Sequence, residues 1–194
     1  MAIYPKAINA RFRSPTNFGA DDGGTKGICA SFVCGSFVEV SVGVDRDAGS
    51  IDNARFRTNG CGFMVAAADA LCDWLRGKIL SELHGLNDQD LTQVICGELG
   101  AFPAERAQCA AVVYQALRNA MSAHRARRIE EFQGEKALIC TCFGVSEESI
   151  MDAIAEHKFT EVEQVSEAYR AGSGCGSCRF LIQEIIDMRT SGFE

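Results

Sequence analysis

The alternation of apolar and polar residues in the first part of the chain predicts a short helix followed by three strands. Apolar residues at helical spacing favour a helix from Tyr4 that ends at Pro15. Residues 20–28 are rich in Gly and Asp, so we expect a loop there. Period-two alternation predicts strands over residues 28–33, 37–44 and 51–58, with a turn at residues 45–49.

Helical periodicity replaces this alternation further along the chain. We expect helices over residues 61–77, 80–83, 88–99 and 103–128. Asp88 should cap the third, because its carboxylate can accept from the free N–H groups at a helix start. Pro103 is well tolerated in the first turn of the fourth. These elements predict an α+β arrangement of a small antiparallel sheet and packed helices.

A charged stretch separates this region from the end of the chain. Residues 129–136 contain Gly134 and are expected to form a linker. Beyond it, helices are predicted from Ser146, over residues 160–171 and over residues 175–189. We therefore expect an α+β domain at residues 1–128 and a small all-α domain at residues 137–194.

Composition excludes several classes of function. A formal net charge of −7 argues against a nucleic-acid partner. No apolar run approaches the roughly 20 residues that span a bilayer, so we expect no membrane association. The first residues lack an apolar signal core, which favours the cytoplasm. We find no phosphate-binding loop, serine triad or paired carboxylates, and therefore expect that the protein is not an enzyme.

Four of the ten cysteines form two closely spaced pairs. Their layout is C-x-C, 32 residues, then C-x-x-C, and they are Cys140, Cys142, Cys175 and Cys178. Four converging thiolates suit an iron-sulfur cluster or a structural zinc ion. Glycines around the second pair allow backbone N–H groups to turn towards sulfur. A disulfide framework would need an oxidising compartment, which the N-terminal residues do not support.

Three further cysteines are candidates for a second metal site. Cys34 precedes one strand of the predicted hairpin and Cys61 follows the other, so antiparallel pairing brings them to the same end of the sheet. Cys61 and Cys109 lie near predicted helix starts, where a thiolate is favoured. The sequence therefore predicts a site at Cys34, Cys61 and Cys109.

Both regions resemble known families. The C-x-C, 32-residue, C-x-x-C arrangement resembles the bacterioferritin-associated ferredoxin-like domain, a helical module whose four cysteines hold one 2Fe-2S cluster. The order of motifs from Tyr4 resembles the NifU iron-sulfur cluster scaffolds, whose first domain has the IscU fold. The matching elements are Tyr4, Pro15-Thr-Asn17, Gly19, Cys34-Gly35, Ala54-Arg-Phe-Arg-Thr-Asn-Gly-Cys61-Gly62, and Pro103 before Cys109.

The resemblance implies iron-sulfur cluster assembly. In that family, cysteines at the positions of Cys34, Cys61 and Cys109 receive iron, and sulfur from a cysteine desulfurase, and pass a transient cluster to apo iron-sulfur proteins. This implies a labile 2Fe-2S or 4Fe-4S cluster, or zinc, in the first domain and a permanent 2Fe-2S cluster in the second. A homodimer is also implied. We expect that the family's third module, with a further C-x-x-C, is absent.

Some positions depart from the family pattern. Ser36 replaces an aspartate and Gln108 replaces a histidine, and both are possible neighbours of the metal ligands. Arg106 stands where relatives with a chaperone-recognition motif carry lysine. The loss of two ionisable groups motivates an alternative, an electron-transfer subunit of a larger oxidoreductase complex with one or two fixed clusters. A zinc-stabilised interaction module is a third hypothesis.

Overall fold

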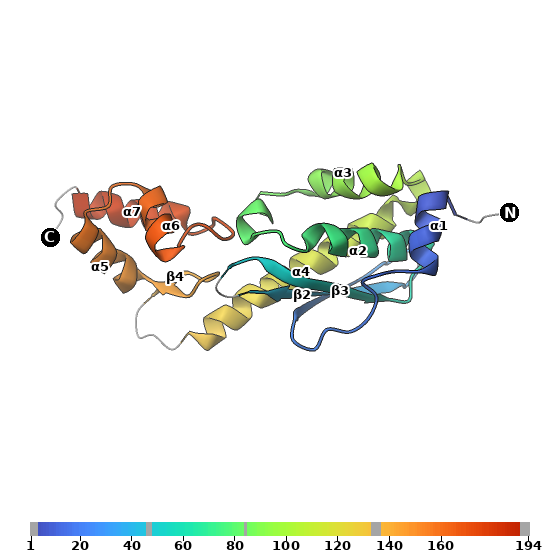
Figure 1. The fold of residues 1–194 in the computed structure, drawn as a ribbon, viewed down its shortest axis with the longest axis horizontal. Coiled ribbons are helices and arrows are strands. Elements are labelled where there is room, and N and C mark those ends of the chain that lie inside the picture. The colour runs from blue at the N-terminus through green and yellow to red at the C-terminus, as the bar shows by residue number, and fades with distance from the viewer. Residues whose placement is uncertain (1–3, 46–47, 84, 133–136, 191–194) are drawn as a thin grey trace. The chain divides into compact units, whose positions relative to one another are not determined.

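The computed structural model describes residues 4–45, 48–83, 85–132 and 137–190 (Figure 1). Their contacts divide the chain into two compact units. The first unit contains residues 4–45, 50–78 and 85–124, and the second contains residues 48–49, 79–83, 125–132 and 137–190. Within the described residues, no helix is long and apolar enough to cross a membrane.

A three-stranded antiparallel sheet lies in the first unit, in the order β1 (Thr25–Ala30), β2 (Phe37–Val44) and β3 (Ile51–Thr58). The bounds predicted for β2 and β3 are confirmed, because strict alternation marks both strands. β1 begins and ends three residues earlier than predicted, so the loop expected at residues 20–28 ends before Thr25.

The position of Gly27 explains this difference. An added Cβ at Gly27 would lie 2.0 Å from the Ala120 nitrogen of helix α4 (Ala107–Glu131). Glycine is therefore needed for close helix-strand packing here, although in the sequence alone it indicates a loop.

One face of the sheet forms the core with helix α2 (Gly62–Leu75). Val38, Val40 and Val42 of β2 alternate along the strand and are almost fully buried. Helix α2 is buried along nearly its whole length, because the alanines at positions 66–68 and 70 in its middle permit close approach of neighbouring elements. The sheet and α2 therefore fix the positions of the loops at their ends.

The remaining helices of this unit lie close to the predicted ranges. They are α1 (Lys6–Arg13) and α3 (Asp88–Leu99), and 3₁₀ turns occur at Leu80–Leu83 in the second unit and at Ala104–Arg106 before α4. The predicted cap of α3 was wrong. Asn87 caps the helix by accepting from the N–H groups of Gln89 and Asp90 at 2.8 and 3.1 Å, and Asp88 is the first helical residue.

An ion-pair network links α1 to α2 and α3. Arg11 pairs with Asp69 and with Asp73 of α2, the latter at 2.7 Å, and it also pairs with Glu98 of α3. Asp69 is only 1% exposed and also accepts from the backbone N–H of Asn17 at 2.9 Å. Burial alone would lower the pKa of Arg11, but its hydrogen bonds to the three carboxylates outweigh that effect and raise the pKa.

The second unit contains three helices and a short ribbon. The helices are α5 (Glu147–His157), α6 (Val162–Tyr169) and α7 (Arg179–Thr190), and the ribbon is β4 (Leu138–Cys140) paired with β5 (Val145–Ser146). The unit is mostly helical as expected, but the sequence did not predict the ribbon. Helix α7 begins after the C-x-x-C pair rather than within it.

The predicted linker is only partly described. Helix α4 continues to Glu131, so the first residues of the predicted 129–136 segment are helical. Residues 133–136 lie outside the described residues. The division into domains at residues 128 and 137 stays a prediction.

We predict that Arg11→Ala destabilises the first unit by about 3 kcal/mol, because it leaves a buried carboxylate at Asp69 without its cation. The urea midpoint of Trp74 fluorescence measures this, since Trp74 on α2 is the only tryptophan. Arg13→Ala, which removes an exposed cation from the same helix, is the control and should change stability little. Equal effects of the two substitutions would contradict the prediction.

Candidate metal centres

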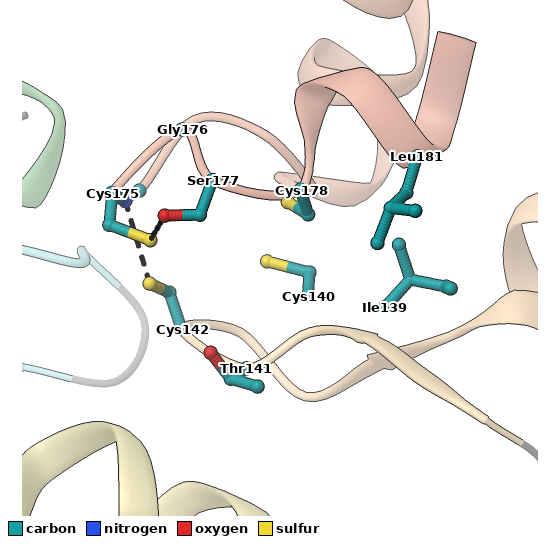
Figure 2. A pocket seen from close by; sticks show the side chains of 10 residues that line it. Ile139, Cys140, Thr141, Cys142, Cys175, Gly176, Ser177, Cys178 and Leu181 are labelled. Atoms are coloured by element: carbon teal, nitrogen blue, oxygen red, sulfur yellow. Dashed lines mark hydrogen bonds between the residues drawn. The ribbon is translucent and has the colours of Figure 1, made fainter. Parts of the chain in front are cut away.

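Four cysteines line one cavity of about 170 Å³ in the second unit. Cys140 ends β4 and Cys142 lies in the turn before β5, whereas Cys175 and Cys178 lie in the loop before α7. Figure 2 shows the two segments facing each other, with the sulfurs of Cys142 and Cys175 opposed across the cavity. Ile139 and Leu181 line its apolar side.

Tight turns bring these segments together. The N–H of Gly144 donates to the carbonyl of Cys140 at 2.8 Å and closes the turn that holds Cys142. An added Cβ at Gly174 would lie 2.8 Å from the Cβ of Cys142, so a side chain there would push the two segments apart. Gly172 has φ +87°, a conformation that L-residues rarely adopt.

Backbone N–H groups point at the sulfurs. The N–H of Cys175 donates to Cys142 Sγ at 3.5 Å, and those of Gly172 and Phe143 donate to Cys140. The sulfurs also form two thiol pairs, and within each pair one thiol donates to its partner. The pKa is therefore lowered at Cys140 by its bond from Cys178 and at Cys175 by its bond from Cys142.

This arrangement fits a metal group held by thiolates. It provides four sulfur donors, N–H groups that stabilise negative sulfur, and a cavity lined by both segments. Within the described ranges, no three His, Cys, Asp or Glu side chains are already gathered at metal-binding distance. The chemistry of the donors suits an iron-sulfur cluster or zinc.

The three other candidate cysteines belong to the first unit. Cys61 precedes α2 as its N-terminal boundary residue, and Cys109 lies in the first turn of α4. Their sulfurs are 3.7 Å apart, so the fold brings this pair together. Cys34 lies on the loop between β1 and β2, close enough to interact electrostatically with Cys109 but not gathered with the pair.

Strand register explains why Cys34 and Cys61 occupy one end of the sheet. Val38 pairs with Thr58, so the loops before β2 and after β3 are neighbours. The Asn59 side chain strengthens the link between these two loops by accepting a hydrogen bond from the N–H of Phe37 at 2.8 Å. The hairpin argument from the sequence therefore agrees with the observed register.

An aromatic cluster fixes the start of α2. The ring of Phe63 packs edge-on against Tyr4 and against Phe102, with centroids 5.4 and 5.3 Å away. The Tyr4 hydroxyl accepts from the N–H of Gly62 at 3.2 Å. These contacts join the N-terminal segment, the residue after Cys61 and the segment before α4. The sequence revealed Tyr4 only as a family match and gave no indication of this positioning role.

The electrostatic environments of the cysteines differ. Burial, with the adjacent Cys61, raises the pKa of Cys109 to about 12, so the predicted thiolate at this helix start was wrong for the metal-free protein. The pKa of the exposed Cys34 is lowered instead. Hydrogen bonds from Ser31 and then Ser36, helped by the charge of Arg106, lower its pKa to about 7.

The two substituted positions have different surroundings. Ser36 contacts Cys34 through both its hydroxyl and its backbone, so it is a direct neighbour of a candidate ligand. Gln108 is half-buried beside Cys109 in the chain. Asp69 serves the ion-pair network of α1 rather than the cysteines.

Comparison with known proteins identifies relatives of both units. Residues 3–131 match the family described as NifU-like N terminal domain, and residues 138–188 match the BFD-like [2Fe-2S] binding domain. The chain is 31% identical over 192 residues to the nitrogen fixation protein NifU of Trichormus azollae, covering 94% of this chain and 63% of that protein. It is 26% identical over 132 residues to the iron-sulfur cluster assembly scaffold protein IscU of Escherichia coli K12, covering 66% and 98% of the two chains.

A solved structure of a nitrogen-fixing NifU-like protein (N-terminal) from Brucella abortus is also similar. The similarity covers 62% of the present chain and 93% of the Brucella abortus chain, with 14% identity and a TM-score of 0.44. The present chain spans about 63% of the length of its NifU relative from Trichormus azollae. The resemblance inferred from the cysteine motifs is confirmed for both regions, and the chain belongs to the family defined by the NifU-like N-terminal domain.

Proposed function

We propose that this protein is a scaffold for iron-sulfur cluster assembly. Cys34, Cys61 and Cys109 hold a transient 2Fe-2S or 4Fe-4S cluster, which is cargo for apo-proteins. A resident 2Fe-2S cluster is held by Cys140, Cys142, Cys175 and Cys178. The proposal involves assembly and transfer, with no catalytic turnover of a small substrate.

One observation carries the proposal for the first unit: a buried thiol pair lies beside a separate, exposed cysteine. The sulfurs of Cys61 and Cys109 are 3.7 Å apart, whereas Cys34 is on an exposed loop. Two fixed sulfurs can retain iron while the exposed third remains open to a sulfur donor or an acceptor protein. Such a site suits a cluster that must leave.

The second unit has the features of a permanent site. Cys140, Cys142 and Cys178 are buried, and their loops are held by backbone N–H donors. When bound, a 2Fe-2S cluster supplies one-electron chemistry, which can serve reductive steps of assembly. Zinc at the same sulfurs would supply none.

The proposed partners follow from the relatives. The proteins named NifU and IscU support a cysteine desulfurase as sulfur donor and apo iron-sulfur proteins as acceptors. A homodimer is part of the same proposal. Ten cysteines without a disulfide among the described residues suit the reducing cytoplasm.

Iron and sulfide contents test the function. We expect about two irons per chain at the start, an increase after incubation with desulfurase, cysteine and ferrous iron, and transfer of the added part to an apo-ferredoxin. Cys61→Ser should keep the starting iron and lose the increase, because it breaks the buried pair. Cys29→Ala, a thiol on β1, is the matched control.

Other outcomes identify the alternatives. A fixed iron content with no transfer would contradict the scaffold and support an electron-transfer subunit. A colourless protein that contains zinc would contradict the resident cluster.

The environment of Cys34 predicts unusual reactivity in the metal-free protein. Because hydrogen bonds lower its pKa to about 7, its thiolate fraction should rise through neutral pH, and iodoacetamide should label it at pH 7 roughly tenfold faster than an ordinary thiol. Ser31→Ala should shift this pH profile upwards, whereas Ser14→Ala, far from the loop in sequence, should not. Peptide mass spectrometry measures labelling at each cysteine, and an ordinary thiol profile at Cys34 would refute the prediction.

The second unit should depend on its metal group for stability. Its core consists mainly of Ile150, Ile154, Val165, Ile182 and Ile186, which is small for an independent domain. Cys175→Ala should therefore remove the resistance of this unit to trypsin, because a lost ligand weakens the link between its two loops. Cys29→Ala should leave the resistance intact. A compact, resistant unit in the metal-free Cys175→Ala protein would show that the core suffices alone.

A further inference from the structure

Two arginines of the second unit lie at the turn that follows Cys142, and the charge of a third acts on Cys175. Arg128 Nη2 lies 3.3 Å from the place that an added Cβ on Gly144 would take. The guanidinium carbon of Arg170 lies 4.4 Å from the centroid of the Phe143 ring. Arg125 is three residues before Arg128 on α4 and therefore shares its face. We refer to Arg125, Arg128 and Arg170 as the arginine rim.

The rim is in contact with residues that serve the cluster cysteines. Phe143, under Arg170, donates its backbone N–H to Cys140. Gly144, beside Arg128, closes the turn around Cys142 through its bond to the Cys140 carbonyl. The charge of Arg125 acts on Cys175, on the opposite segment of the cavity.

Partial burial reduces the screening of the Arg128 charge by solvent. The Arg128 side chain is 18% exposed, and its Nε is buried and makes no hydrogen bond in the described structure. Its Nη1 donates to Glu131 at 3.2 Å, which offsets some of its charge. The surrounding sequence is acidic, with ten acidic and four basic residues over positions 137–194. The rim is therefore a local positive region next to the cysteines.

The positive charge of the rim would affect the reduction of a bound 2Fe-2S cluster most. Four thiolates outweigh the positive charge of an oxidised 2Fe-2S core, and one added electron makes the site more negative still. Positive charge within a few ångströms of the ligand loops stabilises the reduced form more than the oxidised form. Charged residues near the cluster therefore shift its reduction potential.

We propose that the arginine rim raises the reduction potential of the cluster held by Cys140, Cys142, Cys175 and Cys178, so that weaker electron donors can reduce it. The inference rests on the proposed function only in requiring a redox-active cluster at these cysteines. It gives the end of α4, which precedes the predicted linker, a role at the second metal centre. These arginines are positioning and tuning groups and are not ligands.

Redox titration of the purified 194-residue chain with dithionite and mediators tests the inference. Arg125→Gln and Arg170→Gln should each lower the equilibrium constant for reduction by about threefold to tenfold, taking an effective dielectric near 20, which is at most about 59 mV for one electron. Arg125→Lys and Arg170→Lys keep the charge and should restore most of the potential. Arg128, whose Nε is buried, is changed only to lysine, and the reduction potential of the cluster in this variant should change little.

Controls separate charge from structure. Arg189→Gln removes the same charge from the last turn of α7, eleven residues after Cys178, and should leave the potential unchanged. Iron content and the visible spectrum should match the wild type in every variant. Three results would overturn the role of the rim. They are a wild-type reduction potential in the glutamine variants, an equal shift of the potential in Arg189→Gln, and lysine variants whose potential shifts as far as that of the glutamine variants. Absence of a cluster from the wild-type protein would instead overturn the proposed function.

Discussion

Both cysteine sites depend on one electrostatic constraint. Sulfurs that must become thiolates around a metal have to be held close together, where each negative charge disfavours the next. Without metal, the first unit meets this constraint with thiols, because burial and the neighbouring Cys61 raise the pKa of Cys109 to about 12. The second unit meets it with shared protons within its thiol pairs and with N–H donors to sulfur. Several features hold these sulfurs in place. In the first unit they are the β2–β3 register and the aromatic cluster around Phe63, and in the second unit Gly174 leaves room where any side chain would separate the two loops.

The two units differ in how far they enclose their cysteine sulfurs. In the second unit, both sulfur-bearing segments line one cavity and three of the four cysteines are buried. In the first unit, a buried pair is combined with Cys34 on an exposed loop whose neighbours, Phe32 and Val33, are also exposed. Enclosure slows ligand exchange and protects a resident cluster from solvent, whereas an exposed ligand lets another protein reach the metal. The two cysteine sites therefore differ in how far solvent and other proteins can reach their sulfurs.

Parts of the fold could be predicted from the sequence because they depend on local pattern. Period-two alternation located β2 and β3 at their observed bounds, and the position of the hairpin indicated that Cys34 and Cys61 share one end of the sheet. The predicted bounds of β1 were three residues too late because of Gly27. This glycine permits the close approach of α4, a tertiary role, whereas in the sequence alone it indicates a loop. Strands β4 and β5 are too short for periodicity to detect. The pKa of Cys109 was mispredicted because a helix start is a local feature, whereas burial and the contact with Cys61 are tertiary.

The substitution at Ser36 illustrates how one residue can change the chemistry of such a site. A carboxylate at this position, as in the family pattern, would place negative charge beside Cys34 and disfavour its thiolate. Ser36 instead donates hydrogen bonds, and with Ser31 and Arg106 it lowers the pKa of Cys34 to about 7. In the metal-free protein the exposed Cys34 therefore has a substantial thiolate fraction at neutral pH, whereas burial and the contact with Cys61 keep Cys109 protonated. The replacement of the aspartate by Ser36 therefore favours the thiolate form of Cys34 at neutral pH.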